Sequence, residues 1–290
     1  MVSDKKKVTI ITVLIILIGL IFLALHPLLW KPAIVEKSTF PIFALDDFGR
    51  NVTLVKIPEK IVSTAPSNTE ILFALGLGDE VVGVTKYCDY PPEVPERVEA
   101  GNLTVIGGYA DPSIEKIVAL NPDLVVAATN VQRKMIKTLE DKGFVVVALN
   151  PKNITQVILD ISLIGRVTGK ASVAESLANN MQQRISDIKN KMKDLTHRPR
   201  VYYEVWYDPL MTAGPGTWIN ELIEIAGGIN IFGNANERYP QISSEAVIQL
   251  NPEIIIVNVG YHGGITKEDF EKRPGWSLID AVKNDRIYEL

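Results

Sequence analysis

The chain has 290 residues, of which 47% are hydrophobic and 22% charged, a composition typical of a globular protein with one large or two modest domains. Its formal net charge is −4, and its 30 Lys and Arg residues are spread along the sequence. Because no basic stripe is available to neutralise a phosphate backbone, we exclude nucleic acid as a partner.

The first 31 residues differ in composition from the rest. Three lysines at positions 5–7 precede residues 8–25, which are apolar or uncharged and long enough to span a bilayer. The positive charge before this run places the N-terminus in the cytoplasm. We expect residues 1–31 to be a membrane anchor or a signal, and we favour a retained transmembrane helix because no small-residue cleavage site follows. The remainder of the chain should then be extracytoplasmic.

Residues 32–57 are expected to hold two short strands, at 40–44 and 51–55, joined as a hairpin. From 58 to 169, short apolar runs alternate with helical patterns. Apolar strands that alternate with helices are typical of a mostly parallel sheet covered on both faces, so we expect an N-terminal α/β lobe over 58–169. Its predicted strands are 61–63, 81–85, 124–128 and 144–149, and its predicted helices include 70–75 and 114–120.

One long amphipathic helix is predicted over 171–195, within a linker at 170–198. Its apolar residues recur every three or four positions, with Gly169 before it and Pro199 after it. A second α/β lobe is expected over 199–290. Its predicted strands are 201–206, 253–259 and 286–290, and its predicted helices are 218–225 and 245–250.

The two lobes share a repeated segment. Residues 113–123 (SIEKIVALNPD) match residues 243–253 (SSEAVIQLNPE). In each copy a serine begins a helix, Asn-Pro ends it and an apolar strand follows. The two copies are displaced by 130 residues. A solenoid has shorter repeating units, so this displacement indicates duplicated lobes.

Motifs for catalysis and for metal or cofactor binding are missing from the sequence. Neither a dinucleotide loop, nor a phosphate loop, nor a Gly-x-Ser-x-Gly elbow is present. The three histidines, His26, His197 and His262, lie far apart in the sequence and form no metal-ligand cluster. We therefore predict no catalytic residues, no metal site and no resident cofactor.

Aromatic residues gather near the ends of predicted strands, where open α/β sheets bind ligands. Tyr109 follows Gly107-Gly108, and Tyr239 precedes the second copy of the repeat. Such side chains combine broad apolar faces with a polar group, which suits a large ligand in a cleft, although core packing or loop anchoring is the alternative. The Tyr261-His262 loop follows another strand end and is included on the same grounds. The predicted ligand-binding residues are Tyr87, Tyr90, Tyr109, Trp206, Tyr207, Tyr239, Tyr261 and His262.

Two acidic residues occupy equivalent positions in the repeat. Glu115 and Glu245 each lie in the first turn of a predicted helix, where the helix dipole stabilises a carboxylate by roughly 0.3–1 kcal/mol. Helix electrostatics alone would explain them. Alternatively, they form a matched pair of docking contacts for basic residues on a two-fold symmetric partner.

Four segments together resemble the periplasmic cobalamin- and ferric-siderophore-binding proteins of ABC transporters. They are residues 61–70 (IVSTAPSNTE), 82–85 (VGVT), 89–92 (DYPP) and 117–125 (IVALNPDLV). The resemblance implies two Rossmann-like lobes joined by a single rigid helix, with the ligand between them and modest closure on binding. It also implies that Glu115 and Glu245 dock on arginines of a permease dimer that works with ATPase subunits.

The resemblance also bears on the ligand and on the end of the chain. Tyr90, Tyr109, Trp206 and Tyr239 fall at or near positions where relatives place aromatics around a corrinoid. Relatives continue past residues 286–290 with a further helix, so we expect the C-terminal lobe to be truncated or incompletely covered.

Three readings of the function follow. Because the nameable cleft positions are aromatic rather than arginine-rich, cobalamin or a related corrinoid is favoured over a ferric siderophore or haem. A chelatase-like α/β enzyme and a sensor ectodomain that never docks with a transporter are the alternatives from other classes. The sequence favours a membrane-tethered solute-binding protein that is not an enzyme.

Overall fold

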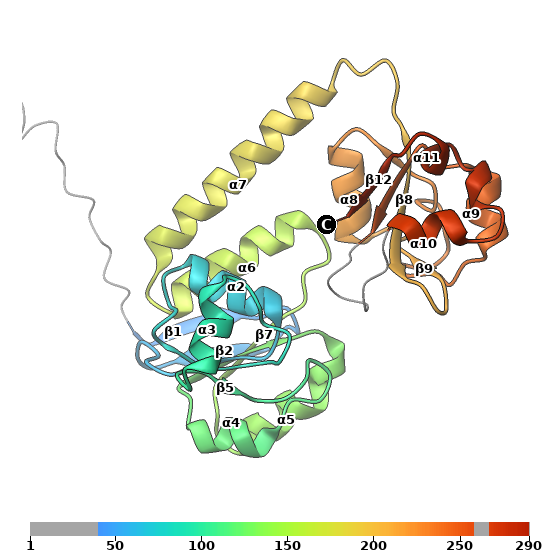
Figure 1. The fold of residues 1–290 in the computed structure, drawn as a ribbon. Helices are drawn as coiled ribbons and strands as arrows, with labels where there is room; N and C mark the ends of the chain where they lie inside the picture. Colours follow the sequence, from blue (N-terminus) through green and yellow to red (C-terminus); the bar gives the residue numbers. More distant parts are fainter. Residues whose placement is uncertain (1–39, 258–266, 290) are drawn as a thin grey trace, which may run out of the picture. The chain divides into compact units, whose positions relative to one another are not determined.

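The computed structural model describes residues 40–257 and 267–289 (Figure 1). Within these residues, no helix is both long and apolar enough to cross a bilayer. The anchor predicted at 1–31 and the loop with Tyr261 and His262 lie outside the described residues.

The N-terminal lobe contains a five-stranded parallel sheet in the order β5-β4-β3-β6-β7. Its internal strand β6 is buried along its whole length, as its uninterrupted apolar sequence predicts. Leu124 and Val126 face one apolar core, and Val125 and Ala127 face a second core on the other side of the sheet. The strands are β3 (Ile61–Ser63), β4 (Val81–Val84), β5 (Thr104–Val105), β6 (Leu124–Ala128) and β7 (Val146–Leu149).

Helices connect these strands, as expected for a parallel sheet. They are α2 (Pro66–Ala74), α3 (Glu93–Glu99), α4 (Ile114–Leu120), α5 (Arg133–Asp141), α6 (Ile154–Val167) and the short 3₁₀ helix η1 (Asn130–Gln132). The helix predicted at 70–75 was expected to begin too late. The observed helix α2 begins at Pro66, shortly after the end of β3. Proline is favoured in the first turn, where its missing N–H costs nothing, and the polar residues that follow it carry no apolar periodicity.

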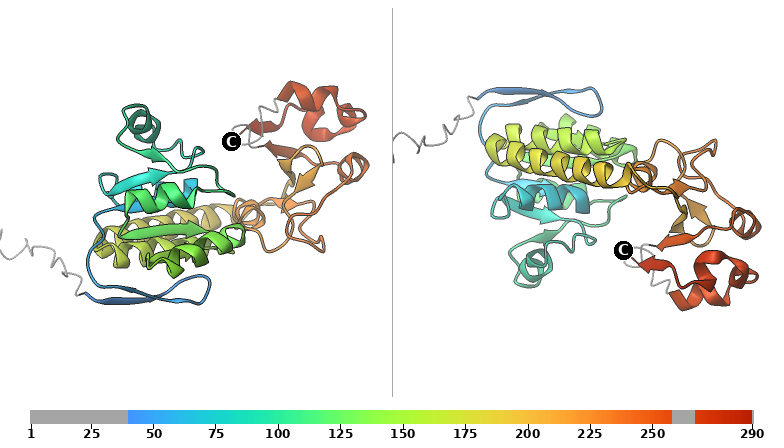
Figure 2. Two further views of the ribbon diagram at one scale, coloured as in Figure 1. Left: turned by 90° about the horizontal axis from the view of Figure 1, so that it is seen from below. Right: turned by 90° about the horizontal axis from the view of Figure 1, so that it is seen from above.

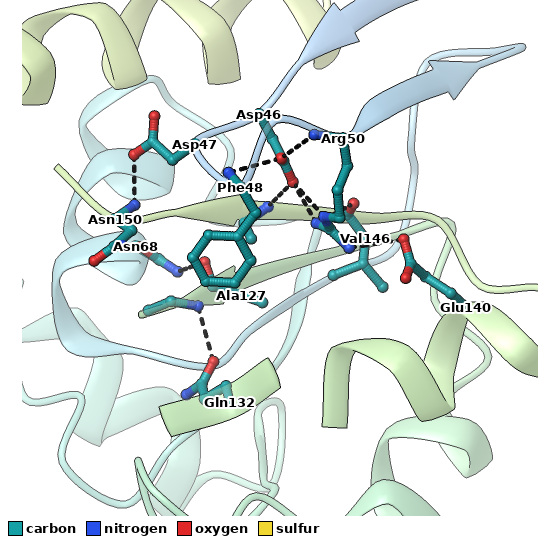
Figure 3. Close-up of polar contacts among 12 residues, drawn as sticks. Asp46, Asp47, Phe48, Arg50, Asn68, Ala127, Gln132, Glu140, Val146 and Asn150 are labelled. Carbon is teal, nitrogen blue, oxygen red and sulfur yellow. Dashed lines mark hydrogen bonds and ion pairs between the residues drawn. The ribbon is translucent and has the colours of Figure 1, made fainter. Parts of the chain in front are cut away.

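The predicted hairpin is present as β1 (Ile42–Leu45) and β2 (Asn51–Leu54), paired antiparallel. The Asp46 carboxylate organises its turn: Oδ1 accepts hydrogen bonds from Phe48 N (2.9 Å) and Arg50 N (3.0 Å). Its Oδ2 accepts from Ala148 N of β7 at 3.1 Å, and Figure 3 shows this carboxylate between the turn and the strand. One buried carboxylate therefore fixes the turn to the N-terminal lobe.

The long helix α7 (Ala171–Met192) follows α6 and packs along it (Figure 2). At their contact, a Cβ on Gly165 would collide with Cβ of Ala174, so glycine allows the close approach. The predicted extension to Leu195 is wrong, since Leu195 N donates to Met192 O and closes a tighter turn. The predicted apolar stripe is at most half-buried: Leu177 and Met181 pack against the core of the N-terminal lobe, and Val173 and Ile188 are exposed. The buried residues of the helix are Ala174 and Ala178, which lie next to the stripe.

The C-terminal lobe has its own five-stranded sheet, in the order β10-β8-β11-β12 with β9 antiparallel to β8. Its strands are β8 (Arg200–Trp206), β9 (Met211–Thr212), β10 (Ile229–Asn230), β11 (Ile254–Val257) and β12 (Ile287–Glu289). The strand predicted at 253–259 ends at Val257 within the described residues. The helices are α8 (Trp218–Ile225), α9 (Ser244–Leu250), α10 (Lys267–Lys272), η2 (Trp276–Leu278) and α11 (Asp280–Lys283).

The repeated sequence adopts the same local structure in both lobes. The Ser113 and Ser243 hydroxyls accept hydrogen bonds from the backbone N–H three residues later, at 3.2 and 3.1 Å. The helices α4 and α9 end at Asn121 and Asn251, both in the left-handed conformation that asparagine tolerates at a helix C-terminus. An internal strand of a sheet, β6 or β11, follows each helix. The structure therefore supports the two-lobe α/β architecture predicted from the sequence.

Candidate ligand-binding site

A pocket of about 770 Å³ is lined by residues of both lobes. Its N-terminal-lobe wall comes from the segment that follows β3 and from Tyr109, and its C-terminal-lobe wall from β8, the start of α8 and Tyr239. These are the carboxyl ends of parallel strands, where open α/β sheets bind ligands. The lining residues are Ala65, Pro66, Ser67, Glu70, Tyr109, Tyr203, Glu204, Val205, Trp218, Ile219 and Tyr239.

Tyr109 is held in place by a buried hydrogen-bond network. Its hydroxyl lies 2.7 Å from Thr129 Oγ1, and its carbonyl oxygen accepts from Gln132 Nε2 at 2.7 Å. Gln132 is itself buried, where its Oε1 accepts from Thr64 Oγ1 and from Ala128 N. This network of hydrogen bonds holds the ring of Tyr109 in the wall of the pocket.

The opposite wall is held by backbone contacts and a helix cap. Trp218 is the first residue of α8, and the Thr217 hydroxyl accepts from Asn220 N at 3.1 Å to cap that helix. Gly214 N donates to the carbonyl oxygen of Arg238 at 2.7 Å, which fixes the chain next to Tyr239. Burial is the main cause that raises the pKa of the Tyr239 hydroxyl, so this group stays protonated and can donate to a ligand.

Glu204 lines the pocket, but its carboxylate is already engaged. Arg273 Nη1 lies 2.6 Å from Glu204 Oε2, and Nη2 lies 2.8 Å from Oε1, a bidentate pair with both side chains buried. The guanidinium also stacks within 4.0–4.6 Å of the rings of Phe270, Tyr207 and Trp276. This pair joins β8 to the segment after α10 and leaves Glu204 little capacity to bind a ligand.

The structure brings together only some of the predicted ligand-binding residues. Tyr109 and Tyr239 line the pocket. Tyr87 and Tyr90 are solvent-exposed, Trp206 Nε1 donates to Asp208 O at 2.7 Å, and Tyr207 stacks on Arg273. These four residues stay predictions for contact with a larger ligand.

Trp218 and Tyr203 were not predicted from the sequence. Trp218 opens a helix rather than following a strand, although its place after Gly214-Pro215-Gly216 indicates a turn at a cleft edge. Tyr203 lies inside β8, where a run of strand residues gives no indication of which face the ring occupies.

Glu115 and Glu245 are both solvent-exposed on equivalent helices of the two lobes. Hydrogen bonds from its own backbone N–H and from the Ser113 hydroxyl lower the pKa of Glu115, so its carboxylate is ionised at neutral pH. Over residues 40–257 and 267–289, neither glutamate takes part in an ion pair. Both carboxylates are accessible from solvent, and their docking role stays a prediction.

A second pocket, of about 410 Å³, shares Ser67, Tyr109, Trp218 and Tyr239 with the first. Its remaining lining is more polar and includes Lys152, Asp160 and Arg238. In the part of the chain that the structure describes, no group of His, Cys, Asp and Glu is arranged to hold a metal ion.

Comparison with known proteins gives consistent matches. Residues 61–290 match the family model described as periplasmic binding protein. The chain is 35% identical over 262 residues to the ABC transporter substrate-binding lipoprotein YvrC of Bacillus subtilis, covering 88% of this chain and 80% of the relative. It is 31% identical over 236 residues to the vitamin B12-binding protein of Vibrio cholerae, covering 80% of each. The periplasmic haem-binding protein RhuT of Roseiflexus is similar in structure, with a TM-score of 0.70 and 28% sequence identity. The match covers 80% of this chain and 89% of RhuT.

Proposed function

Because the chain belongs to the periplasmic binding protein family, we propose that it is the solute-binding component of an ABC importer, which captures cobalamin or a related corrinoid between its lobes. Members of this family are binding proteins, so the chain is not an enzyme. We place its binding lobes outside the cytoplasmic membrane, tethered by the anchor predicted at residues 1–31.

The aromatic pocket is the observation that carries the proposed ligand. Tyr109, Trp218 and Tyr239 present rings from both lobes, and the two carboxylates of the lining are Glu70 and the arginine-paired Glu204. A corrinoid is a broad macrocycle with large apolar faces, which aromatic walls bury well. The relative from Vibrio cholerae, named a vitamin B12-binding protein, supports this choice.

Haem is the second candidate, supported by the similarity to the haem-binding protein of Roseiflexus. Visible-absorbance titration of the purified protein with cyanocobalamin, haemin and a ferric hydroxamate separates the classes. Saturable binding of cyanocobalamin alone supports the proposal. Binding of haemin or the hydroxamate without cyanocobalamin would overturn the corrinoid assignment and retain the transport class.

Trp218→Ala tests the pocket directly. The substitution removes a large aromatic face that contacts both pockets, so we expect cyanocobalamin affinity to fall by about tenfold or more, as for loss of a buried aromatic anchor. Leu222→Ala is the matched control, because this residue lies on the same helix, is exposed to a similar degree and lines neither pocket. Equal affinity losses in both variants would contradict the site.

Docking is tested by reversing two charges. If Glu115 and Glu245 contact basic residues of a permease dimer, the double variant Glu115→Lys/Glu245→Lys should bind ligand normally and fail to support uptake in cells. Glu175→Lys provides a control, since this glutamate is exposed on α7, away from both repeats. Loss of ligand affinity in the double variant, or uptake equal to that of wild type, would remove the docking role.

A further inference from the structure

The second pocket receives one cationic side chain from each lobe. Lys152 precedes α6 in the N-terminal lobe, and Arg238 precedes Tyr239 in the C-terminal lobe. Both side chains are solvent-exposed. Among the described residues, neither takes part in an ion pair. Two cations from different lobes that line one cavity attract an anion.

The electrostatics of the two cations agree with this arrangement. Partial desolvation of the largely exposed Lys152 ammonium is the main cause that lowers its pKa, and the neighbouring Arg238 charge lowers it further. Repulsion between like charges across a cavity is relieved when a negative group binds between them. Asp47 and Arg133 also act on Lys152, with opposite signs. Arg133 hydrogen-bonds to Asn130 Oδ1 and stacks on Phe48, so it is already engaged.

Asp160, the carboxyl group in the lining of the second pocket, does not neutralise the two cations. Asp160 is buried, and its Oδ2 has no hydrogen-bond partner in the described part of the chain. Burial, followed by the charge of Asp47 and a hydrogen bond with it, raises the pKa of Asp160 to about 8. At neutral pH this group is therefore mostly protonated, so it offsets little of the positive charge of the cavity.

We propose that Lys152 and Arg238 form an oxyanion-binding subsite of the cleft, which a phosphate or carboxylate group of the ligand bridges between the lobes. This inference rests on the proposed function, because it assigns a chemical group to the ligand of the same cleft. Aromatic rings shared by both pockets would hold the macrocycle, and the two cations would fix its acidic substituent. A ligand that carries both features would contact both lobes at two points.

Paired ligands distinguish the two sources of the acidic group. Cyanocobalamin carries a phosphodiester that dicyanocobinamide lacks, and haemin carries carboxylates that are masked in its dimethyl ester. Lys152→Gln and Arg238→Gln should each weaken binding of the acidic member of a pair by about tenfold, as expected for loss of a charge-assisted hydrogen bond. Neither substitution should change affinity for the uncharged member. Lys191→Gln and Arg286→Gln remove exposed cations outside both pockets and serve as controls.

Each outcome bears on either the subsite or the ligand class. Equal weakening of both members of a pair, or no weakening of either, would overturn the subsite and leave the proposed function standing. An effect confined to haemin would retain the subsite and overturn the corrinoid assignment. If wild type binds none of the four probes, thermal melts with and without inorganic phosphate test the subsite. A rise in the Tm of wild type that the double variant Lys152→Gln/Arg238→Gln lacks supports the subsite. No rise in the Tm of wild type overturns it.

Discussion

Asp160→Asn should change how the stability of the protein depends on pH. The Asp160 side chain is 3% exposed, and burial together with Asp47 raises its pKa to about 8. In the unfolded chain an aspartate has a pKa of about 3.9. Between these two values the folded protein keeps a proton that the unfolded protein has released. Asparagine has nearly the same shape and is neutral at every pH, so it removes this difference.

The sign and size of the effect follow from proton linkage. Because the unfolded state binds fewer protons than the folded state in this window, the free energy of unfolding falls as pH rises, by about 1.4 kcal/mol per pH unit. Over about four pH units the total is on the order of 5 kcal/mol. The stability contribution is fully present below the unfolded pKa of about 3.9 and is lost as pH rises to about 8.

Urea unfolding of wild type and Asp160→Asn at about pH 5, 6, 7 and 8 measures this effect. The stability of the variant relative to wild type should increase with each step and level off above about pH 8. Asp194→Asn, which removes an exposed carboxylate beyond the end of α7, should follow the wild-type curve. A stability difference between Asp160→Asn and wild type that stays constant across these pH values would refute the buried, protonated state of Asp160.

Two further predictions concern packing and charge. Removing one partner of the buried Glu204–Arg273 pair, as in Glu204→Gln, should lower the free energy of unfolding by about 3–5 kcal/mol, because the Arg273 charge is left buried and uncompensated. Chemical denaturation measures this loss, and a loss below about 1 kcal/mol would contradict the prediction. Gly165→Ala should lower the free energy of unfolding by about 1–3 kcal/mol, since the new Cβ would collide with Ala174 where α6 meets α7. A thermal melt unchanged from wild type would contradict this, because it would show that the two helices can move apart without loss of stability.

Much of the fold was predictable because its strands are buried on both faces. A run such as residues 124–128 has no polar residue at any position, so its identity as a strand and its bounds were both predicted correctly. The helices α4 and α8 were also bounded correctly, since each has a polar residue before its first turn. The strands β5, β9 and β10 are only two residues long, and such short pairings leave no periodicity to detect.

The site was harder to predict than the fold. Of the aromatic residues predicted to contact ligand, Tyr109 and Tyr239 line the pocket, and neither had been placed directly after a predicted strand. Strand position alone does not specify which way a loop side chain turns, so Tyr87 and Tyr90 point to solvent instead. Lys152 and Arg238 line the same cavity because the two lobes meet there. No local pattern in the sequence indicates that two residues so far apart in the chain lie near each other.

Direct contacts between the lobes brace the cleft. Ile154 N, at the start of α6, donates to Glu221 Oε2 of α8 at 2.7 Å, so the C-terminal lobe supplies a carboxylate to the positive end of an N-terminal-lobe helix. The helix α7 packs along α6 and also contacts α8. A cleft braced at two such points loses little conformational entropy when it binds, because its walls are already ordered. In the proposed function, selectivity depends on the chemistry of the walls, where the aromatic rings and the proposed oxyanion subsite favour a broad ligand with an acidic substituent.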